Sequence, residues 1–132
     1  MKRFLLAITV LGAAGVFAAE SVYLCRKCRI LTVKENTPSY PNCGKGGNHL
    51  WFKAAVHGDD IFHCRKCALL IYSKGTPSYS YCYSGGNHYW YKLAVRGKEH
   101  HLCRKCNLQV LSSGRPAYSG CRNNSNHNWQ KL

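Results

Sequence analysis

The sequence repeats one pattern of cysteine and histidine three times at a constant interval. Each copy opens with Cys-Arg-Lys-Cys, has a third cysteine after fourteen intervening residues, and has a histidine after five more. The first cysteines of the copies are Cys25, Cys64 and Cys103, each 39 residues from the next. All nine cysteines of the 132-residue chain belong to this pattern. A constant period of this length indicates tandem copies of one small folding unit.

A unit this small needs a closure other than apolar burial. About 35 residues bury too little surface to offset the backbone entropy lost on folding. Three cysteines per copy cannot all pair as disulfides, but three thiolates and the histidine complete a tetrahedral shell typical of structural zinc. We therefore predict three Zn²⁺ ions, one per copy, with these ligands: Cys25, Cys28, Cys43 and His49; Cys64, Cys67, Cys82 and His88; Cys103, Cys106, Cys121 and His127.

Other closures use the same residues. Disulfides in a mixed scheme suit an exported protein, and iron or an iron–sulfur cluster accepts the same ligand types. The ligand pairs could also combine between copies, with Cys43 and His49 joining Cys64 and Cys67. That arrangement leaves one half-site at each end of the chain, so closure within each copy is preferred.

The segments between the ligands predict short strands. Residues 30–33, 69–72 and 108–111 are rich in β-forming side chains and are too short for helices. Residues 50–53 and 89–92 add a second aromatic stretch after the histidine of the first two copies. The expected fold is all-β, with three tandem zinc-stabilised β-hairpin modules and no helix after the N-terminal leader.

The joints between the copies have a turn-like middle flanked by strand-like residues, at 55–62 and 94–101. Such short joints predict a hairpin between neighbouring modules, with the modules packed in a row. The expected module boundaries are 19–56, 57–95 and 96–132.

The first residues predict an export signal. Lys2 and Arg3 give a basic start, residues 4–19 form an uncharged apolar run, and small residues end at Ala18, where a signal peptidase would cut. The run is shorter than the roughly 20 residues of a spanning helix, so an uncleaved anchor is the less favoured alternative. We expect residues 1–18 to be a signal peptide and the mature protein to be periplasmic or secreted.

The ligand pattern resembles the zinc-ribbon and zinc-knuckle class, in which two ligand pairs clamp one ion. The resemblance rests on Cys25-Arg26-Lys27-Cys28 with Cys43 and His49 and on the two other copies, and it covers only the ligand pairs and their strand context. Ribbons often have proline and glycine around the first pair, whereas arginine and lysine lie inside it here. Gly-Gly-Asn-His after the third cysteine is also faintly similar to iron–sulfur proteins of the CDGSH type, whose ligands are closer together.

The chain is strongly basic, with 19 Lys and Arg against 5 Asp and Glu and a formal charge of +14. The basic residues inside each first ligand pair are expected to compensate the thiolate charge. A second interpretation is a repeated contact surface for a polyanion, formed by Arg26, Lys27, Arg65, Lys66, Arg104 and Lys105. For an exported protein the expected partners are an anionic envelope polymer, a lipid headgroup or a carbohydrate, whereas nucleic acid would have to be met outside the cell.

The aromatic residues that recur in every copy are expected to shield the metal and build a small core, or else to stack on sugar rings or bases. They are Trp51, Trp90 and Trp129 and Tyr40, Tyr79 and Tyr118.

Catalysis has few candidate groups, because three of the five acidic residues lie in the joints and a carboxylate pair is not expected. The leading hypothesis is an exported, non-enzymatic repeat protein with structural zinc and a basic surface that contacts an anionic or carbohydrate partner. A metal-buffering or metal-delivery protein and a thiol-based redox-responsive protein are the alternatives.

Overall fold

The computed structural model describes residues 19–123 and 125–132, so the predicted signal peptide lies outside the described residues. The described chain is all-β, as predicted, and within it no helix is long and apolar enough to cross a membrane. Its strands are β1 (Ser21–Cys25), β2 (Leu31–Lys34), β3 (Trp51–Cys64), β4 (Leu70–Ser73), β5 (Trp90–Cys103), β6 (Gln109–Ser112) and β7 (Trp129–Lys131).

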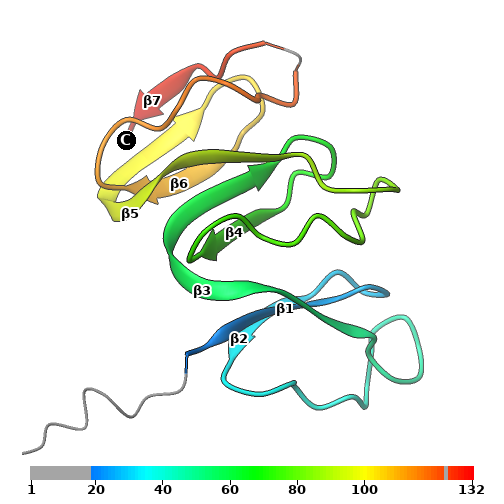
Figure 1. Cartoon of the computed structure of the whole chain (residues 1–132). Helices are drawn as coiled ribbons and strands as arrows, with labels where there is room; N and C mark the ends of the chain where they lie inside the picture. Colours follow the sequence, from blue (N-terminus) through cyan, green and yellow to red (C-terminus); the bar gives the residue numbers. More distant parts are fainter. Residues whose placement is uncertain (1–18, 124) are drawn as a thin grey trace, which may run out of the picture.

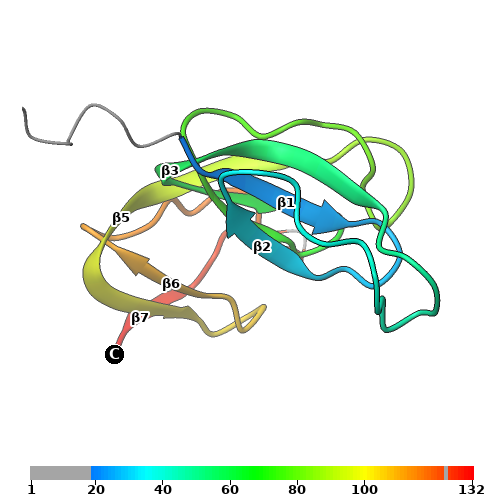
Figure 2. The same cartoon turned by 90° about the horizontal axis from the view of Figure 1, so that it is seen from below.

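Each copy of the repeat, called here module one, two or three, forms a three-stranded antiparallel sheet. In module one, β1 is the central strand, with Val22 opposite both Val33 of β2 and Ala55 of β3. Figure 2 shows β1 between these two strands. Module two repeats the arrangement with β4, the second half of β3 and the first half of β5, and module three with β6, the second half of β5 and β7. Each module therefore has one strand more than a hairpin, and its central strand ends at the first cysteine ligand.

The long strands β3 and β5 each belong to two modules. Each has 14 residues and passes from the outer strand of one sheet to the central strand of the next. The predicted hairpin between modules is therefore wrong, because the joint is a bend within a continuous strand (Figure 1). At this bend His57 and Asp60 both face Ser73, which is the register shift of a β-bulge.

Glycine at the bend is required by close approach of another backbone. A Cβ on Gly58 would lie 2.6 Å from the main-chain nitrogen of Lys74, and one on Gly97 would lie 2.3 Å from that of Ser113. The turn-like composition of the joints therefore marks a place where a strand bends without ending.

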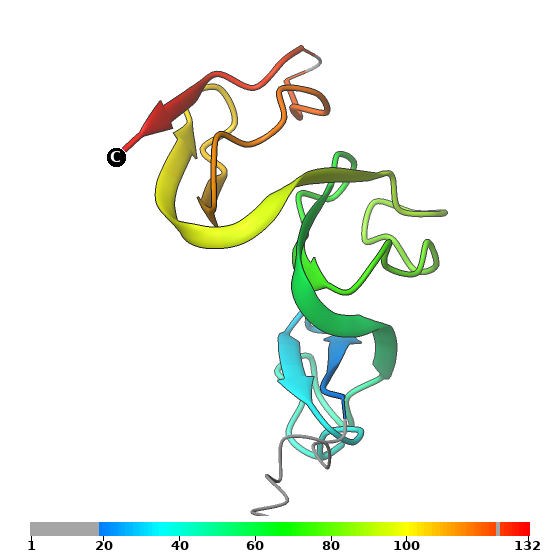
Figure 3. The same ribbon diagram turned by 60° about the vertical axis from the view of Figure 1, so that its left-hand side comes forward.

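Because β3 and β5 turn back, the ligand loops of all three modules lie on the same side of the molecule, on the right in Figure 1. We call this side the metal end, and the side with the turns of β3 and β5 the bend end. Contacts between modules agree with this view. The Tyr83 hydroxyl donates to the Cys25 carbonyl at 3.1 Å, and the rings of His63 and His127 lie 5.9 Å apart. The modules follow one another in chain order, as Figure 3 shows.

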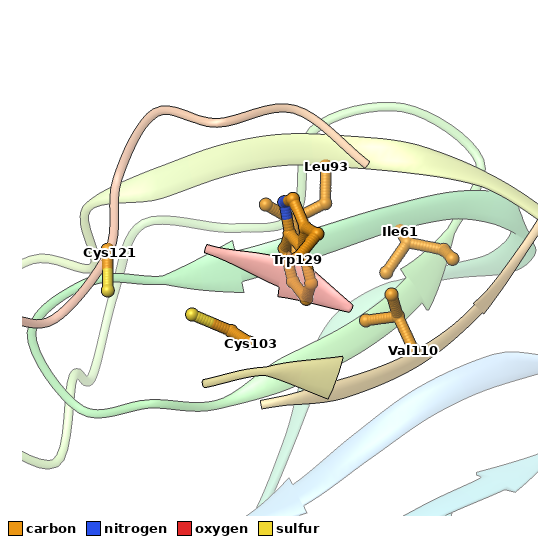
Figure 4. Packing of buried hydrophobic residues seen from close by; sticks show 6 residues of the cluster. All are labelled: Ile61, Leu93, Cys103, Val110, Cys121 and Trp129. Carbon is orange, nitrogen blue, oxygen red and sulfur yellow. The ribbon is translucent and has the colours of Figure 1, made fainter. Parts of the chain in front are cut away.

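Two apolar clusters each join residues of neighbouring modules. One cluster joins Val22, Leu24 and Ala54 of module one to Ile71 of β4 in module two. The other, drawn in Figure 4, packs Ile61 of β3 with residues of module three that include Val110. The sulfur atoms of Cys103 and Cys121 lie at one end of this second cluster. Burial of each aliphatic side chain is worth about 1.5–3 kcal/mol, so these clusters hold neighbouring sheets together.

Candidate metal centres

The structure brings together the three cysteines and the histidine of each copy, and in each group the ligand atoms all lie within 4.8 Å of one another. The Sγ atoms of Cys25 and Cys43 are 3.9 Å apart, and the equivalent distance in module two is also 3.9 Å. The Sγ of the second cysteine lies 3.5, 3.6 and 3.7 Å from the histidine Nδ1 in modules one, two and three. The ligands thus gather within copies and not between them.

These spacings fit a tetrahedral ion. Zinc bonds of about 2.3 Å to sulfur and about 2.0–2.1 Å to nitrogen separate two sulfurs by about 3.8 Å and a sulfur from a nitrogen by about 3.6 Å. A disulfide would need about 2.05 Å between sulfurs, and all nine cysteines, which lie in the described part of the chain, are free thiols. Each group can therefore hold one metal ion through four protein ligands, with Nδ1 as the histidine donor.

The first ligand pair of each module lies in a tight turn, which we call the knuckle and define as the two cysteines and the residues up to one past the second cysteine. In module one, Arg29 donates its N–H to the Cys25 carbonyl at 2.9 Å and has a φ of 65°. Its equivalents Ala68 and Asn107 have φ values of 67° and 63°. A left-handed conformation at non-glycine residues is costly, and its recurrence indicates that the closure of each module imposes it.

The knuckle places N–H groups against the first sulfur. Burial raises the pKa of Cys25, but N–H donors from Cys28, Leu50 and Lys27, together with His49, outweigh it and lower the pKa to about 5. The first cysteines of the other modules are likewise buried and have the equivalent main-chain donors, with the second cysteine in place of the histidine as side-chain donor, and their pKa is also lowered. The lowered pKa thus favours the thiolate form of the first cysteine in each module.

The second cysteine behaves in the opposite way. Burial, with the neighbouring thiols Cys64 and Cys82 adding to it, raises the pKa of Cys67 to about 12, and burial likewise raises that of Cys106 to about 12. Three thiolates cannot share a small volume without a cation between them. This charge pattern is a further reason to expect a metal at the centre of each group.

The knuckle lysines connect the two ligand pairs. Lys66 Nζ donates to the carbonyls of Gly85 at 2.7 Å and Asn87 at 2.9 Å, and Lys27 makes the equivalent contacts with Gly46 and Asn48. Lys105 Nζ donates to the Ser125 hydroxyl and to the Asn126 carbonyl. The three knuckle lysines, which were predicted as polyanion contacts, therefore also hold the ligand loop of their own module by hydrogen bonds.

The knuckle arginines have a different position from the lysines. Arg26 and Arg104 are exposed, and Arg65 is half-buried. Arg26 stacks on the Tyr81 ring of the next module, with its guanidinium carbon 3.8 Å from the ring centroid. In module one the two basic residues of the knuckle thus differ in role, since Lys27 faces its own module and Arg26 faces a neighbour.

A tryptophan stacks on the ligand histidine in every module, which confirms the predicted position of the tryptophans beside the metal. The ring centroids are 4.6 Å apart, at 27° or 28°, for His49 with Trp51, His88 with Trp90, and His127 with Trp129. Each indole Nε1 also donates to a main-chain carbonyl at 2.9 to 3.0 Å. The indole therefore fixes the orientation of the ligand ring.

The tyrosines expected to help shield the metal are instead about half exposed, so that prediction is wrong. Tyr40 is 53%, Tyr79 55% and Tyr118 47% exposed. The main chain of these tyrosines contacts the ligand histidines instead. His49 donates its N–H to the Tyr40 carbonyl, and the other two modules repeat this hydrogen bond.

The residues that meet between modules were not predicted. Tyr81, Tyr83, Arg29 and Arg122 differ between the copies, so the repeat gave no signal for them. His63 has no equivalent in every copy and was expected to be a linker residue, but it is fully buried and has no hydrogen-bond partner within the described residues. Burial, with His127 and Arg122 nearby, lowers the pKa of His63 to about 4, so it is a neutral core residue at neutral pH.

Comparison of the chain with protein-family models, with curated proteins and with solved structures finds no match. The functional argument therefore rests on the residues of this chain.

Proposed function

We propose that this protein is an exported, non-enzymatic repeat protein in which three Zn²⁺ ions close the modules and the metal end binds an anionic polymer or carbohydrate of the cell envelope. The observation that carries the structural role of the metal is the agreement of three separate ligand groups with one tetrahedral geometry. Four protein ligands per ion leave no coordination position for a substrate, which supports a non-catalytic role.

The positions of the ligands in the fold favour structural zinc over zinc that the protein transports. In each module the knuckle follows the central strand, and the histidine lies two residues before the third strand. Removing the ion would free the ends of both strands. Metal binding and folding are expected to be coupled in such a site.

The anionic partner is supported by an uneven distribution of charge. None of the five acidic residues lies in a knuckle or in a loop that carries the third cysteine and the histidine. They lie before β1, after β2 and in the turns of β3 and β5, as Glu20, Glu35, Asp59, Asp60 and Glu99.

Three of these acids neutralise cations of the strands. Asp60 pairs with Lys92 at 3.2 Å, Glu99 with Lys131 at 3.2 Å, and Asp59 with Arg96 at 4.0 Å. No acidic residue lies in a knuckle, and the two or three cations of each knuckle exceed the charge of about −1 on a Zn²⁺ ion with three thiolates, so we expect a net positive charge at the metal end.

A chelator titration tests the structural role of the metal. We expect native mass spectrometry to find three zinc ions on the chain, and circular dichroism to lose the β-signal in proportion to the zinc removed. Zinc that exchanges fast without loss of structure would contradict the proposal and indicate a metal-delivery protein. The same mass spectrum, taken on protein recovered from its native cell, tests cleavage after Ala18.

Retention on immobilised heparin tests the anionic partner. The protein should be held at low salt and released as salt screens the contacts, because the Debye length falls from about 10 Å at 0.1 M to about 3 Å at 1 M. Failure to bind at low salt would remove the polyanion from the proposal.

A further inference from the structure

Two basic clefts lie where neighbouring modules meet at the metal end. The first has a volume of about 380 Å³. Its lining includes Arg26, Lys27 and Arg29 from the knuckle of module one, and Tyr81 and Tyr83 from the loop of module two. The cleft therefore exists only because two modules are in contact.

The second cleft, of about 360 Å³, lies at the junction of modules two and three. It is lined by Arg65 and Lys66 of the module-two knuckle, by Tyr89, and by Arg122 from the loop of module three. Arg65 and Lys66 are the repeat equivalents of Arg26 and Lys27. The same construction thus appears at both junctions, with three cations and at least one tyrosine each.

The third cation belongs to the knuckle in the first cleft and to the loop of the following module in the second cleft. In the first, Arg29 of the knuckle faces Tyr83 of the next module, with the guanidinium carbon 4.8 Å from the ring centroid. In the second, the position of Arg29 is Ala68 and the position of Tyr83 is Arg122. Two changes with opposite effects on charge keep the number of cations at three. A solvated surface would not require such an exchange, whereas a binding site for an anion would.

The first cleft also holds its arginines in place before any ligand arrives. Arg26 lies on Tyr81 and Arg29 on Tyr83, and the Tyr83 hydroxyl is itself fixed by donating to the Cys25 carbonyl. A guanidinium stacked on an aromatic ring keeps its N–H groups available at its edge. Preorganised donors of this kind lower the entropy lost when a ligand binds.

We propose that each junction cleft binds one sulfate or phosphate group, and that the two clefts together hold a linear sulfated or phosphorylated glycan. This rests on the proposed function and names the class of its partner. Two arginines and one lysine line each cleft. The lysine donates to carbonyls of its own module and adds its positive charge, while the two guanidinium groups offer N–H donors to a tetrahedral oxyanion, whose three or four acceptor oxygens suit them better than a single carboxylate does.

Aromatic surface beside the second cleft favours a glycan. Tyr89 lines this cleft and also a neighbouring hollow formed with Tyr79, Trp90 and Tyr91. Tyr79 and Tyr89 are 55% and 56% exposed, so their rings can lie against the rings of a sugar chain. A polymer that alternates anionic groups with rings matches this alternation of cleft and aromatic surface.

The experiment measures the affinity of the zinc-loaded protein for a heparin octasaccharide, with the metal count checked for every variant. Arg29→Ala should weaken binding about tenfold, because it removes a charge-assisted contact. Arg122→Tyr should have a similar effect at the second cleft. Both substitutions introduce the residue that module two has at that position, so the variants should retain three zinc ions. Lys34→Ala, at the exposed far end of β2, is the matched control and should change binding less than twofold.

A cross-junction rescue makes the test specific to the clefts. Tyr83→Arg added to Arg29→Ala rebuilds the first cleft in the manner of the second and should restore the affinity, and Ala68→Arg should rescue Arg122→Tyr. If the cleft variants match the Lys34→Ala control while the parent protein still binds heparin, the clefts are not the sites and only the proposed function stands. If the parent protein binds no heparin, the proposed function fails first. If single-stranded DNA of equal charge binds more tightly than the octasaccharide, the assignment to a glycan is overturned.

Discussion

The inside of a module and the junction between modules are held by different forces. Inside a module, four ligands from two separate segments converge on one point. At a junction, Ile71 and Ile61 are fully buried, each in an apolar cluster with residues of a neighbouring module. The difference shows how so short a unit can repeat, since coordination closes each unit and apolar packing aligns it with the next.

The largest expected effect comes from removing a ligand in the middle module. Cys64→Ser should lower the zinc count from three to two and destabilise the protein by about 5 kcal/mol or more, because the folding of the module depends on its metal. Native mass spectrometry and urea unfolding measure the two quantities. Cys25→Ser in module one is the comparison, and it should leave the β-signal of modules two and three largely intact. Equal stability of Cys64→Ser and the parent would show that metal coordination does not close the module.

A substitution at the junction should separate stability from metal binding. Ile71→Ala is expected to cost about 2–5 kcal/mol through lost burial and the cavity left behind, while three zinc ions remain bound. Denaturant unfolding of the zinc-loaded protein gives the cost. A loss of zinc in this variant would mean that the junction and the metal centre are one cooperative unit.

The bend of β3 should tolerate no side chain on its inner side. Gly58→Ala places a Cβ 2.6 Å from the Lys74 nitrogen, and we expect a loss of about 2 kcal/mol without a change in zinc count. Gly44→Ala is the control, because a Cβ there meets nothing within 4 Å. Its free energy of unfolding, measured by thermal unfolding, should stay within about 0.5 kcal/mol of that of the parent. Two variants of equal stability would show that the bend is not fixed by this contact.

The smallest effect concerns protons at the metal centres. The pKa of the second cysteine is raised in each module, to about 12 for Cys67 and Cys106, so in the metal-free protein this thiol is protonated at neutral pH. Zinc must displace that proton, so affinity should fall about tenfold, or about 1.4 kcal/mol, per pH unit as pH decreases. Below about pH 5 the Cys25 thiolate also becomes protonated and the decrease should steepen. Calorimetry in buffers of different ionisation enthalpy counts the protons released, and an affinity independent of pH would contradict the thiolate assignment.

The metal ligands and the all-β fold follow from the sequence because both depend on local spacing. A cysteine pair with two intervening residues can form only a tight turn, and the strand-like segments beside it are too short for helices. The aromatic stretches at 50–53 and 89–92 form the third strands of modules one and two, as predicted, whereas the central strand β1 of module one was not predicted. The continuity of β3 was not predicted either, because the glycine and aspartates at 57–60 look like the end of a strand although the strand continues through a bulge.

The junction contacts could not be predicted from the repeat for a different reason. Arg29 and Tyr83 are far apart in the chain and have no equivalent pair in the next junction, where the corresponding residues are Ala68 and Arg122. Only the curvature of β3, which returns module two to the side of module one, brings them together. A comparison of the copies identifies what they share and misses what lies between them.

A strand that serves two sheets also restricts how the gene for such a protein can change. One residue inserted into β3 would invert the facing of every side chain beyond it, so that Ile61 and its neighbours would turn from the core to water. A deletion would do the same. The lengths of β3 and β5 are therefore fixed by the two sheets that each strand serves.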